Sequence, residues 1–178
     1  MKFYNLKSYY IITEIKEHIN YKMSILSLIN STKSNSITKG DDFVTKTDWE
    51  FQNEKRDYLE KFYTMIRPYM DKMTYELKCT EWNISNAWFQ IYSKKSKHNW
   101  HLHNNTNYTN IYYLNLPNDE LKTQLYDIRD EKIIDDIEIE EGQLLTFPAH
   151  IVHRSPKNNT EETKVIISFN SNFDGVRI

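Results

Sequence analysis

The sequence is poor in cysteine, with Cys79 alone, and it has no long apolar run. A single thiol excludes a disulfide framework, so a reducing, cytoplasmic environment is expected. Cys79 itself is expected to be a small buried apolar residue. No stretch approaches the roughly 18 apolar residues that a membrane helix needs. The first residues are too polar for a secretory signal.

A strong net charge is also lacking, because 23 Lys and Arg against 25 Asp and Glu leave a net charge of −2. This balance gives no whole-protein reason to expect binding to nucleic acid or to an anionic membrane. The basic run at residues 94–97 is expected to be a solvated turn. With 39% hydrophobic residues, the chain has enough apolar material for a core. Its length predicts a single domain, residues 1–178.

The N-terminal part predicts helices. Residues 3–12 are rich in β-formers and predict an edge strand. From Thr13, apolar residues recur at helical spacing. Residues 30–47 are polar and predict a connecting loop, with a mobile lid over a site as the less favoured alternative. Residues 50–77 predict a second helix, which Pro68 should kink or split.

After Thr80 the apolar period changes to two, which is typical of strands. Residues 81–92 predict one or two strands. Further strand candidates are 99–103, 109–116, 122–128, 133–139, 143–147, 150–154 and 163–171. Two helices followed by these short strands predict an α+β, mainly β fold, a double-stranded β-helix (jelly roll, cupin-like) backed by N-terminal helices. The helical support is placed at about 13–77 and the jelly-roll core at about 80–173.

Three histidines predict a metal site. His101 and His103 are one residue apart and share a face if residues 100–103 are extended. His153 follows 50 residues after His103, far enough for the chain to cross a barrel and return. Three ligands of this kind leave open positions on the metal, as an oxygen-activating or hydrolytic site requires.

The other histidines are expected to be ordinary hydrogen-bonded residues of the surface or core. His18 and His98 belong to this group. His150 lies three residues before His153 and would face the opposite side of a strand. A solvated turn is likewise the preferred interpretation of the asparagines in the segment that follows His103, with substrate contacts as the alternative: Asn104, Asn105 and Asn107.

Several motifs between residues 82 and 173 resemble the iron(II)- and 2-oxoglutarate-dependent oxygenases, especially the prolyl-hydroxylase-like branch and small oxygenases of phages and bacteria. The segment IYYLN at 111–115 is similar to the strand that follows the first metal motif of prolyl hydroxylases. GQLLTFP at 142–148 resembles the turn and strand that lead to the distal histidine, which His153 matches. The segment at 168–170 is similar to the end of the last strand.

This resemblance implies a set of cofactors and binding residues. Fe(II) would be held by His101, His103 and His153, with 2-oxoglutarate as cosubstrate and O₂ as oxidant. The family usually has His-x-Asp as its first motif, and here His103 stands in place of the aspartate. Three neutral imidazoles leave the iron more positive than two imidazoles and a carboxylate.

The resemblance also implies a pocket for the cosubstrate. Lys164 stands where the family usually places an arginine that grips the distal carboxylate of 2-oxoglutarate. Lysine lacks the bidentate fork of arginine, so Tyr113 is expected to donate to the same carboxylate. Tyr92 is expected either to reach the cosubstrate or to pack in the core. Ile166 stands where many members have a serine. Tyr113 alternates with Tyr112, so a shift of register by one residue would exchange their roles.

The implied function is a hydroxylase that couples oxidative decarboxylation of 2-oxoglutarate to succinate with oxidation of an unidentified substrate. It would act in the cytoplasm, in the host cytoplasm if the gene belongs to a phage. One alternative is a cupin-type iron dioxygenase that uses three histidines and no 2-oxoglutarate. A second is a non-catalytic jelly-roll binding protein. A zinc hydrolase is less favoured, because no glutamate accompanies the histidines in the helical arrangement of such enzymes.

Overall fold

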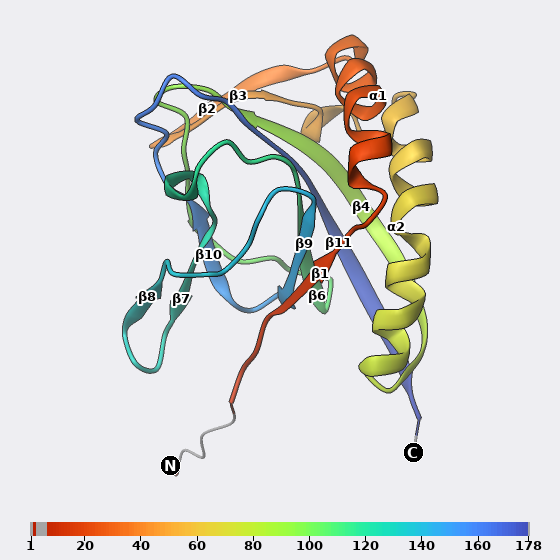
Figure 1. The fold of residues 1–178 in the computed structure, drawn as a ribbon. Helices are drawn as coiled ribbons and strands as arrows, with labels where there is room; N and C mark the ends of the chain where they lie inside the picture. The colour runs from red at the N-terminus through yellow and green to blue at the C-terminus, as the bar shows by residue number, and fades with distance from the viewer. Residues whose placement is uncertain (1, 3–6, 178) are drawn as a thin grey trace.

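The computed structural model describes residues 2 and 7–177, which form two antiparallel β-sheets with two helices packed on the outer face of the larger sheet (Figure 1). The helices are α1 (His18–Ser31) and α2 (Asp57–Glu76). Short 3₁₀ turns lie at Trp49–Phe51 and Asp119–Leu121. Neither helix in this described part is both long and apolar enough to cross a membrane.

The larger sheet has the strand order β1-β9-β6-β11-β4-β3-β2, and the smaller has the order β5-β10-β7-β8. The strands of the larger sheet are β1 (Ile11–Glu14), β2 (Asn35–Lys39), β3 (Asp42–Thr47), β4 (Cys79–Tyr92), β6 (Tyr108–Asn115), β9 (Gln143–Pro148) and β11 (Lys164–Val176). Those of the smaller are β5 (His98–His101), β7 (Gln124–Asp127), β8 (Lys132–Ile134) and β10 (Val152–Ser155). The two facing sheets agree with the predicted jelly roll.

Two hydrophobic cores lie on opposite faces of the larger sheet. The outer core joins the sheet to the helices, where the fully buried Phe62 of α2 packs against Tyr112 and Phe169. The inner core lies between the two sheets and contains Tyr113. Because side chains alternate along β6, Tyr112 and Tyr113 enter different cores. Tyr113 is therefore the tyrosine on the inner face.

The N-terminal part differs from its prediction. An edge strand is present, but as β1 at Ile11–Glu14, where it pairs with β9. Residues 7–10 have no regular structure, and positions 3–6 of the predicted strand lie outside the described residues. The helix expected from Thr13 begins at His18, because pairing with β9 holds Thr13 and Glu14 in extended conformation and a turn follows them.

The predicted loop at 30–47 is wrong, because most of it, residues 35–47, forms the β2–β3 hairpin. Gly40 has φ +58°, which suits the tight turn between the strands. β3 pairs with β4, and the N–H of Phe43 donates to the carbonyl of Lys97 just before β5. The hairpin thus joins the larger sheet to the start of the smaller one.

Two further predictions are settled by the structure. Helix α2 runs through Pro68 without being split, and the proline ring lies on the exposed side of the helix. The segment predicted as one or two strands is the single strand β4. The later strand candidates are all found, although β8 is shorter than expected and β5 ends at His101.

Replacement of Phe62 by alanine should lower the free energy of unfolding by roughly 3–5 kcal/mol, because it leaves a cavity between α2 and the larger sheet. Urea denaturation followed by circular dichroism measures the change. Lys61→Ala, on the exposed side of the same helix, is the matched control and should stay within about 0.5 kcal/mol of the wild type. Equal losses in the two variants would contradict this account of the outer core.

Candidate metal centre

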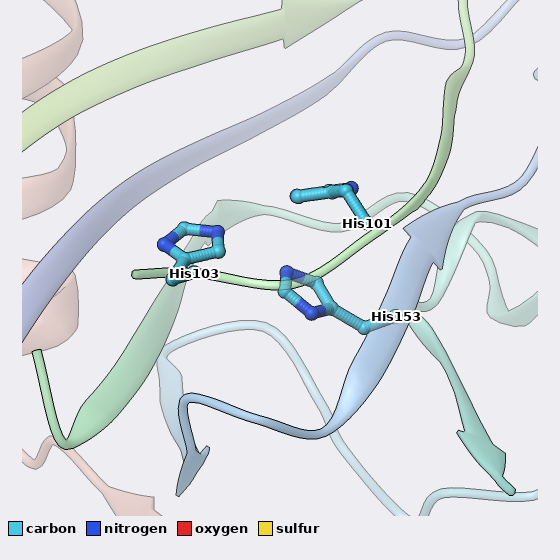
Figure 2. Close-up of side chains that lie close together, drawn as sticks. All are labelled: His101, His103 and His153. Carbon is cyan, nitrogen blue, oxygen red and sulfur yellow. The ribbon is translucent and has the colours of Figure 1, made fainter. Parts of the chain in front are cut away.

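The three predicted histidines meet at one point (Figure 2). His101 ends β5, and His153 on the neighbouring strand β10 is its direct partner in the antiparallel pairing. His103 lies two residues beyond β5, where its N–H donates to the carbonyl of Ala149. One ring nitrogen from each histidine lies within 4.8 Å of the others. Metal–nitrogen bonds are about 2.1 Å, so only a small inward movement of the rings would bring all three into coordination.

Hydrogen bonds define which ring nitrogen of each histidine is free. Nδ1 of His101 lies 2.7 Å from the carbonyl of Asn99, and Nδ1 of His153 lies 3.0 Å from that of Ile151. A carbonyl oxygen only accepts, so Nδ1 carries the proton and Nε2 keeps its lone pair. His103 Nδ1 lies 2.6 Å from Oδ1 of Asn170. Metal-bound histidines generally donate their second ring N–H to an oxygen in this way.

Burial keeps the three imidazoles neutral. It lowers the pKa of His101 to about 4, with the nearby His98 as a smaller cause. Burial also lowers the pKa of His103, and it lowers that of His153 well below the ordinary value. Neutral imidazole is the form that binds a metal. The donor set therefore fits a borderline divalent cation such as Fe(II).

Aromatic rings enclose the three ligands. The indole of Trp88 stacks on His103, with centroids 5.9 Å apart at 20°, and Phe147 meets His153 edge-on at 4.8 Å. His98 stacks on His101 at 3.9 Å and lines the same pocket. His98 was predicted to be an ordinary hydrogen-bonded residue of the surface or core, and its contact with His101 was not predicted. Its position depends on the irregular β5–β10 pairing, which leaves no pattern in the sequence.

The histidines open into a pocket of about 440 Å³ between the sheets. Its floor is formed by inward-facing residues of the three central strands of the larger sheet. From β4 these are Asn86, Trp88, Gln90 and Tyr92; from β11, Ile166, Ser168 and Asn170; from β6, Thr109 and Ile111. At the mouth the β2–β3 hairpin contributes Ile37, Lys39 and Asp42. The segment predicted as a connector thus forms part of the pocket wall.

Lys164 lies buried beside the deep end of this pocket, with 1% of its surface exposed. Its ammonium donates to the carbonyl of Leu121 at 2.8 Å and to Oγ of Ser155 at 2.5 Å, and it lies 4.5 Å above the ring of Tyr92. Within the described residues no carboxylate pairs with it. Burial lowers the pKa of Lys164 to about 7. An unpaired buried ammonium is costly in free energy and favours an anion beside it.

The two predicted cosubstrate tyrosines occupy different positions. Tyr92 lines the pocket beneath the ammonium of Lys164. Tyr113 is fully buried in the inner core, where its hydroxyl accepts from the N–H of Thr123 at 3.1 Å. Thr123 itself lines the pocket. The hydroxyl of Tyr113 is therefore one residue removed from the pocket surface, and its contact with a cosubstrate stays a prediction. Ile166 lines the pocket, as its inward register requires.

The remaining predicted residues have other surroundings. His18 is buried between α1 and the sheet, with Nδ1 2.7 Å from the hydroxyl of Tyr112. His150 is exposed and lines a different groove, which agrees with its predicted orientation away from the metal centre. Cys79 is half-buried rather than buried.

The asparagines after His103 divide into two kinds. Asn104 lines the pocket. Asn105 occupies a turn with φ +60°, and the side chain of Asn107 bonds to the backbone of Phe173 at 3.1 and 3.0 Å. In the basic run, Lys94 and Lys95 are exposed in a turn, as predicted, whereas Ser96 is fully buried and its hydroxyl hydrogen-bonds to that of Thr45.

No protein-family model and no curated protein sequence matches this chain. Solved structures do match. The α-ketoglutarate-dependent epimerase SnoN from nogalamycin biosynthesis superposes with a TM-score of 0.71 and 13% identity, over 93% of this chain and 77% of SnoN. A Pseudomonas putida prolyl-4-hydroxylase gives 0.67 and 11%, over 93% of each chain. A Trichoplax adhaerens prolyl hydroxylase gives 0.63 and 15%, over 93% of this chain and 83% of the enzyme. The chain therefore has the fold of these oxygenases, and the predicted jelly roll is confirmed.

The pH dependence of the free energy of unfolding should differ between the wild type and Lys164→Met, because the variant lacks the buried amine. Between pH 7 and pH 10.5, Lys164 is protonated in the unfolded chain but neutral in the folded protein, because burial lowers its pKa from 10.5 to about 7. Its stability should therefore rise with pH above 7. Relative to Lys164→Met, the wild type should gain roughly 3 kcal/mol of unfolding free energy between pH 6 and 9.5. Denaturant unfolding at several pH values measures the difference. A constant difference would mean that Lys164 is normally charged in the fold.

Proposed function

We propose that this protein is an Fe(II)- and 2-oxoglutarate-dependent oxygenase that couples decarboxylation of 2-oxoglutarate to succinate with hydroxylation of a substrate. The main support is that the neutral imidazoles of His101, His103 and His153 lie close together, and that the buried ammonium of Lys164, which pairs with no carboxylate in the described residues, bonds to Ser155 two residues from His153. The first feature suits a metal, and the second suits the far carboxylate of a diacid bound to that metal. The fold shared with the oxygenases above supports the same reaction class.

In this proposal His101, His103 and His153 hold the iron through Nε2. Their Nδ1 groups are engaged by oxygen atoms, so the rings are held before any metal enters. Iron with 2-oxoglutarate supplies the activation of O₂ that oxidises the substrate. The protein's part is to hold these groups in position and to exclude water. The stacked rings of Trp88 and His98 and the edge of Phe147 serve that exclusion.

Lys164 is proposed to hold the distal carboxylate of 2-oxoglutarate. The ammonium bonds to Ser155, which is two residues from His153 along β10. Two residues of strand span about 6.6 Å and share a face, a distance comparable with the length of a five-carbon diacid. Tyr92 lies under the ammonium, and Tyr113 reaches the same end of the barrel through Thr123. The diacid would neutralise the unpaired charge and raise the pKa of Lys164.

The substrate is proposed to enter past the β2–β3 hairpin. Side chains at this mouth include Trp49 and the amides of Asn86 and Asn104. The SnoN structure with Fe³⁺ and α-ketoglutarate holds nogalamycin RO, and the Trichoplax enzyme is in complex with a peptide fragment of hypoxia inducible factor. Structures of this fold thus contain ligands as different as a small molecule and a peptide, and the substrate here stays unidentified. We place the protein in the cytoplasm, in keeping with its free thiol Cys79.

A cupin-type iron dioxygenase without 2-oxoglutarate is the second candidate, because the donor set contains three histidines and no carboxylate. In that case Lys164 would have no ligand to bind. In the non-catalytic alternative, a jelly-roll binding protein, the histidines would hold no iron. The two experiments below separate these three readings.

Anaerobic titration of the wild type with Fe(II) should give a dissociation constant below micromolar. Each of His101→Ala, His103→Ala and His153→Ala removes a proposed ligand. Loss of a residue that only hydrogen-bonds to a metal ligand typically weakens binding 10–100-fold, so loss of a ligand itself should weaken Fe(II) binding by more. His150→Ala, an exposed histidine outside the pocket, is the matched control and should leave the affinity unchanged. Wild-type affinity weaker than micromolar would favour the non-catalytic alternative.

With Fe(II) and O₂, the wild type should convert 2-oxoglutarate into succinate, detectable even without substrate as slow uncoupled turnover. Lys164→Ala should raise the KM for 2-oxoglutarate roughly 10- to 100-fold, because a charge-assisted hydrogen bond is lost. Lys94→Ala, which removes an exposed lysine, controls for the loss of positive charge. Tight iron binding without succinate, and without any effect of Lys164→Ala, would favour the cupin-type dioxygenase.

A further inference from the structure

We infer that Asn170 is a positioning residue that makes His103 a competent metal ligand, by accepting the Nδ1 proton and so directing the Nε2 lone pair at the metal. This inference rests on the proposed function. It concerns the position where a histidine stands in place of the carboxylate expected from the His-x-Asp motif. It assigns Asn170, which lines the pocket, a role that is exerted through His103 and not as a metal ligand.

The three ligands are held in two different ways. His101 and His153 each use a backbone carbonyl two residues earlier in the chain, Asn99 and Ile151. A backbone carbonyl has no donor, so these two tautomers are determined by the strand itself. His103 instead meets Asn170, a side-chain amide 67 residues away, at 2.6 Å. His103 is thus the one ligand of the three whose tautomer depends on another side chain.

An amide has two ends with opposite effects on His103. With Oδ1 toward the ring, as in the structure, the imidazole donates from Nδ1 and its Nε2 is free for a metal. With the NH₂ group toward the ring, Nδ1 would have to accept, and the proton would move to Nε2 and block coordination. The orientation of this one amide therefore determines whether the third ligand can bind.

The strand around Asn170 has an irregularity that directs its side chain. The β4–β11 register shifts between Asn170 and Ser171, so Ser85 on β4 has no direct partner. The Ser85 hydroxyl donates to the carbonyl of Asn170 at 3.4 Å. Bulges of this kind re-aim side chains and are frequent beside active sites. Asn170 is itself 6% exposed, so solvent competes little for its amide.

Asn170 determines which nitrogen of His103 carries the proton, and Trp88 holds the plane of the same ring. Its indole stacks on His103 at 20°, while Trp49 meets Trp88 edge-on at 4.4 Å. Asn170 at Nδ1 and Trp88 against the face thus hold His103 from two sides.

The first test reads the tautomer directly in the metal-free wild type. Long-range ¹H–¹⁵N NMR of the histidine rings distinguishes Nδ1–H from Nε2–H, with assignments from the single histidine-to-alanine variants. We expect Nδ1–H for His103, as for His101 and His153. An Nε2–H tautomer at His103 would overturn the inference. This measurement requires neither metal nor turnover, so it stands apart from the outcome of the proposed function.

The second test compares three variants by NMR and by titration with Co(II), a spectroscopic stand-in for Fe(II). Asn170→Ala should release the His103 tautomer and weaken metal binding about 10–100-fold. Asn170→Asp keeps an acceptor at the same place and should preserve both the tautomer and the affinity. Ser168→Ala is the matched control, because it lies on the same face of β11 and loses one buried hydrogen bond, to Gln90 at 3.1 Å, without touching a histidine.

The outcomes separate a positioning role from a structural one. If Asn170 only supports the fold, Asn170→Ala and Ser168→Ala should lower thermal stability with the same small effect on Co(II) affinity. Wild-type affinity and an unchanged His103 tautomer in Asn170→Ala would also reject the inference. If wild-type NMR shows Nδ1–H at His103 but no succinate forms from 2-oxoglutarate, the proposed reaction fails while the positioning of His103 stands.

Discussion

The antiparallel pairing of β5 with β10 is the contact on which the site depends. It sets His101 directly opposite His153, although the two are 52 positions apart in the chain. Directly paired residues of an antiparallel ladder lie about 4.5–5.5 Å apart at Cα, with both side chains on the same face. One register match thus brings two imidazoles together, and His103 follows because the chain after β5 stays tied to the carbonyl of Ala149. A slip of the pairing by one residue would turn one ring to the other face.

The central strand β11 organises the pocket along its length. Its inward residues alternate from the ammonium of Lys164 at one end to the amide of Asn170 at the other, with Ile166 and Ser168 between them. The buried ammonium of Lys164 and the amide that meets His103 therefore belong to one strand that is paired on both sides. The helices contribute from outside, because the core around Phe62 holds the opposite face of the same strand through Phe169. The floor of the site is therefore also the centre of the fold.

Sequence patterns were sufficient for features that repeat locally. The i, i+2 histidines and the period of two after Thr80 predicted the strands and the meeting of His101, His103 and His153, and the structure has the strands and brings the three rings together. Their role as metal ligands stays a proposal. The β2–β3 hairpin was missed because most of its residues are polar and its pairing with β4 is non-local. Asn170 appeared only as part of a strand-end motif, with no role. Its bond to His103 joins β11 of the larger sheet to the segment that follows β5 of the smaller sheet, and such a contact has no local signature.

Under the proposed function, the charges of the site explain why three histidine ligands and a buried lysine belong together. Two imidazoles and a carboxylate would reduce the charge of a divalent ion to +1, whereas three imidazoles leave it at +2. The ammonium of Lys164 adds a further charge at the deep end, and no carboxylate within the described residues offsets it. A dianion bound between the metal and Lys164 would reduce the positive charge at both. Metal and diacid should therefore bind with positive coupling, and by linkage each must raise the affinity for the other by the same factor. In the proposed enzyme, histidine at position 103 would thus increase the electrostatic contribution of the diacid, and this would offset the bidentate grip that lysine lacks compared with arginine.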